Sequence, residues 1–346
     1  MKLNRRSLGL AAVAAMTVAT FGAPEMAAAS PDKPVIALSN SYYGNTWRRQ
    51  MVDAFTAEAE KAKAEGKIAD FVVLNGDGSV NQQNSQMAEL ILRGVDAIAI
   101  NAASETALNG LAEKACAAGI KIIAFDSLLT ADCAYKLSFD FTGYKKEQAK
   151  RTLELIGNKG NVIVVRGVKG SGPDNLMYSA QKEVLDANPD VKIVAEVFGQ
   201  ATASVAQSAI ANVLPSLPQV DAVLAQGGSD DYGIVQAFLQ AGGPYADKLP
   251  VIEGGGSTDF VIWWADAAKN GYKTTSMNTT PGIGGAAFWL AYEIVKGATP
   301  PKDMVMPVAT VDESNLAEAS KDLKPGMIIS PSFSQEWVQE NLVKKN

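Results

Sequence analysis

Short apolar runs alternate with helical patterns along almost the whole chain from residue 34 onward. Most of these runs are continuously apolar, which is typical of strands that are buried on both faces in a parallel sheet covered by helices. Strands and helices at this spacing predict βαβ units and doubly wound parallel sheets of the α/β class. The predicted strands are Val35–Ser39, Phe71–Leu74, Ala97–Ile100, Lys121–Phe125, Lys136–Phe139, Val162–Val165, Lys192–Val197, Ala222–Ala225, Val251–Glu253, Thr274–Met277 and Met304–Val308.

Helical patterns fill the intervals between these strands. Gly94, Gly119 and Asn188-Pro189 stand where several of the helices are expected to end. The predicted strands are more than one sheet usually contains. We therefore expect two lobes, each a βαβ sandwich. The predicted helices are Thr46–Ala64, Ser79–Leu92, Glu105–Ala118, Lys145–Ile156, Leu176–Ala187, Ser204–Leu214, Asp230–Ala241 and Ile283–Val295.

Polar residues follow the predicted strands directly, at the positions where doubly wound sheets bind their ligands. The residues in these positions are Asn40-Ser41, Asn101, Asp126-Ser127, Asp140, Gln226 and Glu253. The carboxyl ends of parallel strands meet at one edge of a sheet, so the sequence predicts a polar ligand site there. Lys145-Lys146, in contrast, is expected on a solvated helix face.

Histidine is absent from the chain. This excludes Ser-His-Asp and Cys-His catalysis and histidine-based zinc sites. The glycines of the segment RGVKGSGPDN do not fit GxGxxG, and no GxxxxGK[ST] occurs, so nucleotide binding has no support. We therefore predict neither a cofactor nor a metal.

Residues 1–29 have the pattern of a secretory signal peptide, with a basic start, an apolar run Leu8–Phe21 and small residues before a cleavage site near Ala29. The run of about 14 residues is too short to favour a spanning helix, so a retained membrane anchor is the weaker alternative. Arg5-Arg6 leaves twin-arginine export open beside general secretion.

Export would leave an acidic protein. Cleavage removes Lys2, Arg5, Arg6 and Glu25 from 31 basic and 37 acidic residues, which leaves 28 against 36 and a net charge of −8. An acidic chain is poorly suited to phosphate backbones, so no nucleic-acid partner is expected. Outside the cytoplasm the two cysteines, Cys116 and Cys133, are expected to form a disulfide, with two separate thiols as the alternative.

Four segments together resemble the type I periplasmic binding proteins of ribose- and galactose-type ABC importers. They are VIALSNSYYGNTWRRQMVDAF, LILRGVDAIAINAASETALNGLAEKACAAGIKIIAFDS, DAVLAQ and TTPGIGGAAFWLAYEIVKG. The resemblance implies two αβα lobes joined by three hinge crossings, near residues 140, 278–279 and 309–310. The first lobe would contain residues 34–139 and 279–309, and the second would contain residues 140–278 and 310–346.

The resemblance also implies ligand positions, and the first-lobe half of the site matches the family better. In that lobe the implied residues are Ser41, Asn45, Trp47, Arg48, Asn101 and Asp126. Arg48 stands where ribose-type proteins have an aromatic residue, which favours a more oxidised or differently hydroxylated solute. Ser127 stands where the family has an arginine beside the aspartate, so the charge pair of the family is missing there.

The second-lobe half departs further from the family pattern. Ala201 takes the place of an aromatic residue in the cleft, and Gly227 and Gly255 take the places of an asparagine and an aspartate. The candidate ligand residues on this side are Asn175, Gln226, Glu253 and Asn278.

The function implied is that of a periplasmic, monomeric solute-binding subunit, which binds a sugar or polyol and delivers it to a membrane permease. A receptor for a signalling molecule, feeding chemotaxis, is the alternative within the same fold. An exported α/β enzyme would need a nucleophile–base pair that the sequence lacks. A two-lobed transcription regulator would need a helix-turn-helix where the signal peptide stands.

Overall fold

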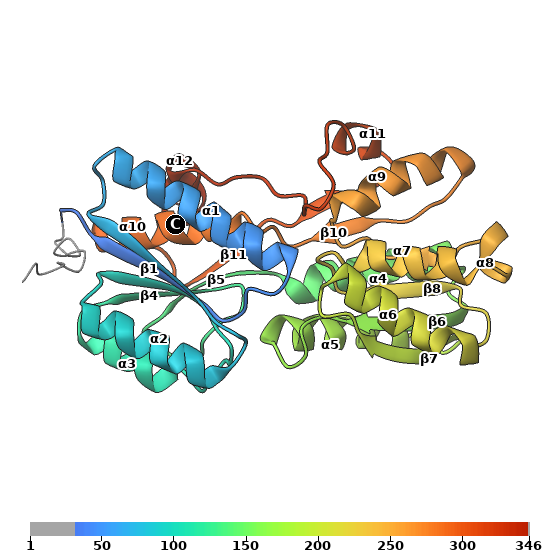
Figure 1. Cartoon of the computed structure of the whole chain (residues 1–346), viewed down its shortest axis with the longest axis horizontal. Helices are drawn as coiled ribbons and strands as arrows, with labels where there is room; N and C mark the ends of the chain where they lie inside the picture. Colours follow the sequence, from blue (N-terminus) through green and yellow to red (C-terminus); the bar gives the residue numbers. More distant parts are fainter. Residues whose placement is uncertain (1–31, 345–346) are drawn as a thin grey trace, which may run out of the picture.

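The structure is a computed structural model that describes residues 32–344. Within that range the strands form two parallel sheets and one short antiparallel ribbon, and each parallel sheet is covered by helices on both faces (Figure 1). The chain thus folds into two lobes that lie end to end, which confirms the predicted α/β class. The predicted signal peptide, residues 1–29, lies outside the described residues.

The first lobe contains a six-stranded parallel sheet in the order β11-β5-β4-β3-β1-β2. Every residue of β1 is buried, which explains its continuously apolar sequence. Helices α1 (Thr46–Ala64) and α10 (Ile283–Val295) cover one face, and α2 (Val80–Arg93) and α3 (Asn109–Ala117) cover the other. The strands are β1 (Val35–Asn40), β2 (Asp70–Asn75), β3 (Ala97–Asn101), β4 (Lys121–Phe125), β5 (Tyr135–Phe139) and β11 (Asp303–Met306).

The second lobe contains a four-stranded parallel sheet in the order β7-β6-β8-β9. Its helices α6, α7 and α9 pack on one face and α4 and α5 on the other. The strands are β6 (Gly160–Arg166), β7 (Val191–Phe198), β8 (Ala222–Ala225) and β9 (Val251–Ile252). The helices are α4 (Phe141–Leu155), α5 (Gly172–Asp186), α6 (Ala203–Val213), α7 (Asp230–Ala241), α8 (Pro244–Asp247), α9 (Thr258–Ala267) and α11 (Leu316–Ala319).

Three segments of the chain cross between the lobes, in the regions between β5 and α4, between β10 (Ser276–Asn278) and α10, and between β11 and β12 (Ala309–Val311). The first crossing lies between β5 and α4, where the Asp140 carboxylate accepts a hydrogen bond from the Gly143 amide at 2.8 Å and caps α4. Strands β10 and β12 pair antiparallel, so the second and third crossings support each other.

A fourth crossing, which the sequence did not predict, runs through residues 328–333 (Figure 1). The amide of Ile329 donates to Gly256 of the second lobe at 2.8 Å. One residue earlier, the amide and carbonyl of Ile328 both bond the side chain of Gln50 on α1, at 2.7 and 3.1 Å. The backbone here is therefore tied to both lobes.

The end of the chain returns to the first lobe, although the prediction placed all of residues 310–346 in the second. Helix α12 (Gln335–Val338) packs against α10, and Phe333, Val338 and Leu342 join the first-lobe core. The physical reason is the composition of α10, whose residues are apolar around most of the helix and need cover on the outer side as well.

Helix α3 begins four residues later than predicted, at Asn109 instead of Glu105. The backbone before it is held in an irregular loop by non-helical bonds. The Glu105 carbonyl accepts hydrogen bonds from the amide and hydroxyl of Thr130, at 2.9 and 3.1 Å. Ala103 donates to the Gln83 side chain at 2.7 Å. These partners outweigh the helix propensity of the segment, and they leave Glu105 at the rim of the first lobe.

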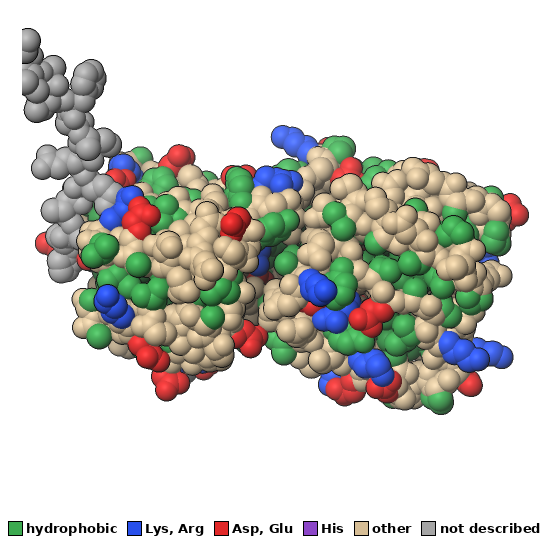
Figure 2. All heavy atoms as spheres, turned by 60° about the horizontal axis from the view of Figure 1, so that its bottom comes forward, with side chains coloured by type: hydrophobic (Ala, Val, Ile, Leu, Met, Phe, Trp, Pro, Cys, Tyr) green, Lys and Arg blue, Asp and Glu red, His purple; other side chains and the backbone are tan. Residues whose placement is uncertain are grey.

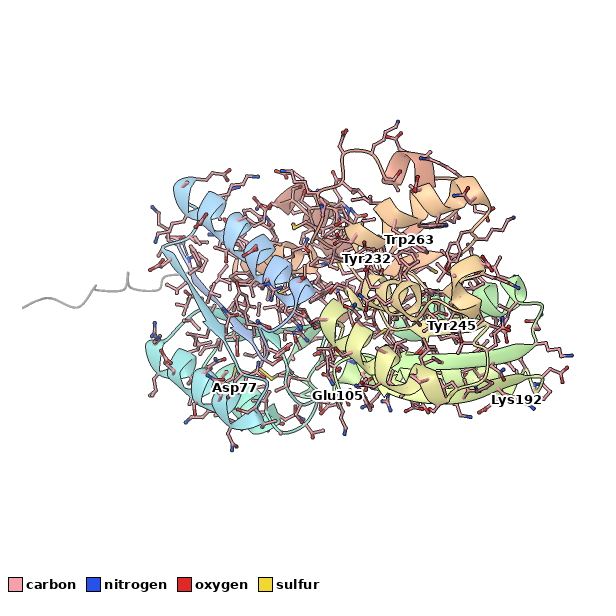
Figure 3. All side chains as sticks on the ribbon, turned by 45° about the vertical axis from the view of Figure 1, so that its right-hand side comes forward. Asp77, Glu105, Lys192, Tyr232, Tyr245 and Trp263 are labelled. Carbon is pink, nitrogen blue, oxygen red and sulfur yellow. A yellow bond between two sulfur atoms is a disulfide. The ribbon has the colours of Figure 1, made fainter. Side chains whose placement is uncertain are left out.

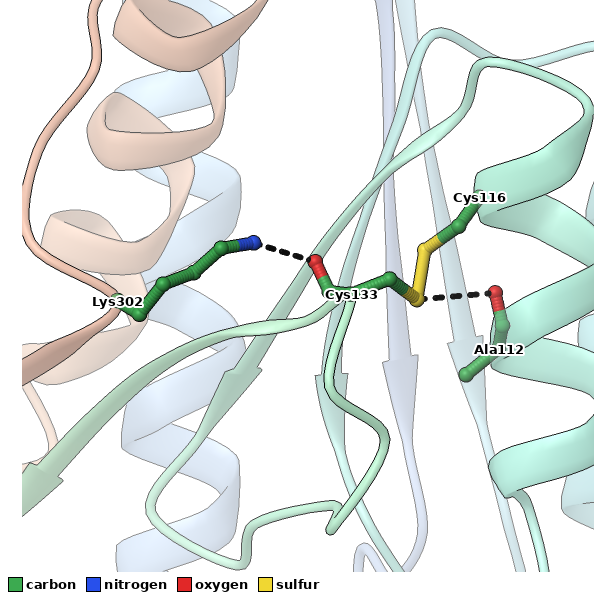
Figure 4. The surroundings of a disulfide bond; sticks show 4 residues. All are labelled: Ala112, Cys116, Cys133 and Lys302. Atoms are coloured by element: carbon green, nitrogen blue, oxygen red, sulfur yellow. Dashed lines mark hydrogen bonds between the residues drawn. A yellow bond between two sulfur atoms is a disulfide. The ribbon is translucent and has the colours of Figure 1, made fainter.

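Cys116 and Cys133 form a disulfide, as predicted (Figure 4). It joins α3 to the loop that precedes β5, across a sequence separation of 17 residues. The Lys302 ammonium donates to the Cys133 carbonyl at 2.8 Å, so this edge of the first lobe is also linked to the segment before β11.

Replacing both cysteines with serine is expected to lower the free energy of unfolding by about 2–4 kcal/mol, because the unfolded chain regains the entropy of the closed loop. Urea denaturation monitored by circular dichroism measures this. Reduction of the native protein should produce the same loss, and the double variant should not respond to reductant. Equal stability of the native protein and the variant would contradict the prediction.

None of the helices in residues 32–344 combines the length and the apolar character that a membrane crossing requires.

Candidate functional site: the cleft between the lobes

A cleft lies between the two lobes (Figure 2). Residues that follow the carboxyl ends of strands in both sheets line it, among them Asp126 after β4 and Gln226 after β8. The cleft encloses an empty volume of about 520 Å³, part of which is open to solvent. The residues that line it are Asn45, Trp47, Arg48, Asp126, Phe141, Gly167, Val168, Ser171, Pro173, Asp174, Met177, Ala201, Gln226, Gly227, Gly228 and Thr279.

The first-lobe wall begins at the N-terminus of α1. The Asn45 side-chain oxygen caps this helix by accepting the Arg48 amide at 2.8 Å, which leaves the amide nitrogen of Asn45 for other partners. The Trp47 indole N–H donates to the carbonyl of Thr279 at 2.9 Å. The ring is thereby fixed between the first helix and the second crossing, and it presents an apolar surface to the cleft.

Asp126 and Arg48 form the charged centre of this wall. Their closest carboxylate oxygen and guanidinium nitrogen lie 3.6 Å apart, and both side chains are more than nine-tenths buried. Asn101 donates to the Asp126 carboxylate at 3.0 Å. Arg48 reaches the side-chain oxygens of Asn40 and Ser127 only at 3.4 and 3.5 Å. The guanidinium is thus loosely held and retains hydrogen-bonding capacity.

This geometry corrects the inference that the site lacks the charge pair of the family. Arg48, on α1, supplies the positive charge that the residue at 127 does not. Burial raises the pKa of the Asp126 carboxyl, and the nearby Arg48 opposes that rise. Burial likewise lowers the pKa of Arg48, and Asp126 opposes the fall. The two buried charges therefore stabilise each other in the cleft wall.

The second-lobe wall contains an aspartate that the sequence analysis missed. Asp174 is fully buried, and its carboxylate accepts bonds from the Arg166 guanidinium at 2.7 and 3.1 Å and from the Gly167 amide at 3.2 Å. The sequence interpretation chose its neighbour Asn175, which is exposed and meets only Arg166, at 3.3 Å. The sequence feature that distinguishes the two residues is Ser171, the N-cap of α5. Its hydroxyl accepts a hydrogen bond from the Asp174 amide and thereby sets which residue of the first turn faces inward.

Gln226 lines the cleft as predicted, but its amide is largely engaged by the protein. Its oxygen accepts the Gly167 amide at 2.8 Å, and its nitrogen donates to the Asp174 carbonyl at 3.1 Å. Gln226 therefore braces the β6–α5 loop against the end of β8. Beyond it, Gly227, Gly228 and Ala201 form a wall almost without side chains.

Five of the ten predicted ligand residues line the cleft: Asn45, Trp47, Arg48, Asp126 and Gln226. Asn101 lies one layer behind, where it positions Asp126. Ser41 lies behind the wall too, and its amide donates to the Asn101 carbonyl at 3.1 Å. Strand ends bring such residues to the correct edge of the sheet, but side-chain direction decides which of them reach the cleft.

Asn278 is placed in the hinge and does not line the cleft. Its amide nitrogen donates to the carbonyls of Thr279 and Ile329 at 2.9 and 3.0 Å, so it joins the second crossing to the fourth. Its neighbour Thr279 lines the cleft instead.

Glu253 is fully buried inside the second lobe, behind the cleft wall, where it pairs with Lys145. The Lys145 ammonium lies 3.5 Å from the Glu253 carboxylate, and it donates to the side chain of Gln148 at 2.7 Å and to the carbonyl of Ala225. The expectation that Lys145 lies on a solvated face is thus wrong. Burial lowers the pKa of Lys145 and raises that of Glu253. The pair anchors the end of β8, one residue before Gln226.

No group of three or more Cys, Asp or Glu residues in the described part of the chain is arranged to hold a metal ion. The cleft offers hydrogen-bonding groups to a ligand, and Trp47 and Phe141 provide apolar surface.

A sequence profile described as the periplasmic binding protein domain matches residues 36–299. The chain belongs to this family. A crystal structure of an ABC transporter solute binding protein from Thermobispora bispora superposes on this periplasmic binding protein with a TM-score of 0.83 at 38% identity, over 89% of this chain and 94% of the other.

Several relatives of this periplasmic binding protein are named for their solutes. A xylitol-binding protein of Mycolicibacterium smegmatis is 27% identical over 260 residues, which cover 73% of this chain and 72% of the relative. A D-apiose import binding protein of Paraburkholderia graminis is 27% identical over 230 residues, which cover 65% and 69%. The resemblance to periplasmic binding proteins that the sequence showed is therefore confirmed.

Proposed function

We propose that this protein is the solute-binding subunit of an ABC importer and that it binds an uncharged sugar or polyol between its lobes. The observation that carries the proposal is the buried Asp126–Arg48 pair at the cleft wall, with Asn45 beside it. A carboxylate that accepts and a guanidinium and amide that donate suit the hydroxyl groups of a polyol. The relatives named for xylitol and D-apiose support this solute class.

The charge balance of the cleft favours a neutral solute over a sugar acid. Arg48 is opposed by Asp126, and Asp174 is opposed by Arg166. A carboxylate on the solute would have to compete with Asp126 for Arg48 in a buried site, where an unmatched charge is costly. The apolar faces of Trp47 and Phe141 remain for the C–H side of the solute.

Binding requires both lobes, because the proposed contacts come from each side of the cleft. The solute would shift the population from an open to a closed form by hinge motion at the crossings, and the closed form would dock on a membrane permease. This role involves no catalysis, cofactor or nucleic acid. Export to the periplasm, with cleavage near residue 29, and a monomeric state are part of the proposal.

A thermal-shift screen of residues 30–346 against polyols, neutral sugars, sugar acids and nucleosides tests the proposal. At about 100 times its dissociation constant, a true solute adds roughly 2.7 kcal/mol of stability, which raises Tm clearly. We expect a rise with one neutral class and none with sugar acids. A folded sample that responds to sugar acids only, or to nucleosides only, would contradict the assignment.

Asn45→Ser tests the same wall without loss of the helix cap, since serine caps as well as asparagine does. The variant lacks the amide that is proposed to donate to the solute, so affinity should fall about 2- to 13-fold, as expected for one neutral hydrogen bond. Isothermal titration with the solute found in the screen measures this. The stability of the solute-free protein should stay close to that of the native protein, and unchanged affinity would remove Asn45 from the site.

A further inference from the structure

The rims of the two lobes approach each other beside the cleft, where the β3–α3 loop lies near the start of α5. A methyl group built on Gly172, the first residue of α5, would overlap the carboxylate oxygen Oε1 of Glu105. Figure 3 shows Glu105 at the boundary between the first lobe and the ribbon of the second. The carboxylate therefore reaches from one lobe to the helix terminus of the other.

The backbone of the loop that carries Glu105 is held by hydrogen bonds at two points. It is fixed by Thr130 on one side and, through Ala103, by the buried side chain of Gln83 on the other. The backbone of Glu105 is thus fixed relative to the first-lobe core, and its exposed side chain extends from this rim towards α5.

The N-terminus of α5 can interact favourably with a negative charge from another part of the chain. The acid within its own first turn, Asp174, is already paired with Arg166. Pro173 has no N–H, and Ser171 caps only the amide of Asp174. The Glu105 carboxylate therefore lies beside the positively polarised end of a 15-residue helix. Glycine at position 172 lets the carboxylate approach this closely, since any larger residue would displace it.

We propose that Glu105 is an interlobe latch, which favours the closed cleft by docking its carboxylate on the N-terminus of α5 at Gly172. The latch rests on the proposed function, because closure matters only if the cleft captures a solute. It acts beside the cleft, and neither residue lines the binding wall. Its contribution sets how tightly, and for how long, a bound solute is held, without changing which solute fits.

Two variants remove the latch from opposite lobes. Glu105→Gln removes the charge and retains the shape, and Gly172→Ala displaces the carboxylate. Each is expected to lower the ratio of closed to open molecules about two- to five-fold, which is the range of a charge at a helix terminus. The double variant should be no worse than either single variant, because both remove the same contact.

Matched controls lie on α3 of the first lobe, away from the second. Glu113→Gln and Gly110→Ala change the same residue types at exposed positions, and a methyl group on Gly110 would meet nothing. Both controls should leave the distribution of interlobe distances unchanged. A folding defect in any variant is identified by its urea midpoint before the distances are compared.

The measurement is a spin-label distance distribution in solute-free protein, with labels on cysteines introduced at the exposed residues Leu92 of α2 and Ser179 of α5. The native protein should show a short-distance population that both latch variants deplete and that 1 M salt weakens. Identical distributions in native, latch and control proteins would overturn the latch. No solute is present, so failure of the solute assignment leaves this result intact, and failure of the latch leaves the assignment intact.

Discussion

Asp126→Asn is expected to weaken solute binding about 10- to 150-fold, the range of a lost hydrogen bond to a charged group. Asparagine matches the aspartate in size, and it tolerates the left-handed backbone conformation of this position, where φ is 56°. The backbone of the wall is therefore retained. What the variant loses is the carboxylate that the proposed function assigns to solute hydroxyls and the counter-charge of the buried Arg48.

Titration calorimetry with the solute from the screen measures the loss. Asp132→Asn is the matched control, because Asp132 is an exposed aspartate of the same lobe and does not line the cleft. The control should bind like the native protein. An Asp126→Asn variant that is folded and binds with native affinity would show that the solute lies elsewhere.

Lys145→Met is expected to lower the free energy of unfolding by about 3–5 kcal/mol, because it leaves the buried carboxylate of Glu253 without its cation. Asp230 lies in the same buried region, and its pKa is raised well above the ordinary value by burial and by the adjacent Asp231. Loss of the ammonium thus leaves more than one acid to be protonated or hydrated when the second lobe folds.

The neighbouring lysine provides the control for this experiment. Lys146 is partly exposed and pairs with Glu183 at the surface, so Lys146→Met should change the stability by less than about 1 kcal/mol. The double variant Lys145→Met/Glu253→Gln should recover part of the loss, since the side chain at position 253 then carries no charge. Urea denaturation at neutral pH measures all three variants. Similar losses at positions 145 and 146 would contradict a buried ion pair.

Periodicity was sufficient for the fold because each strand carries its own signal. The runs Lys121–Phe125 and Ala222–Ala225 became strands with the predicted bounds, as burial on both faces leaves a continuous apolar segment. The predicted start of α3 was wrong because Thr130, a residue distant in sequence, donates a hydrogen bond to the Glu105 carbonyl. The lobe predicted for the C-terminal residues was wrong because their position depends on the outer face of α10, which they cover. No local sequence pattern reveals that this face needs cover.

The site was predictable to the level of the strand end and no further. Position after a strand identified Asp126 and Gln226 but also Glu253, whose side chain turns into the second lobe towards Lys145. The periodicity of α4 could not distinguish a lysine on its surface from one in its core. In the same way, Asn175 and Asp174 are neighbours in sequence, and the cap at Ser171 decides between them.

The most direct test is a crystal structure of residues 30–346 with the solute that the screen identifies. We expect solute density between the lobes, within hydrogen-bonding distance of Asp126 and Arg48 on one side and in contact with the Asp174–Gln226 wall on the other. Density on the outer surface of either lobe, with the cleft containing only water, would contradict this expectation.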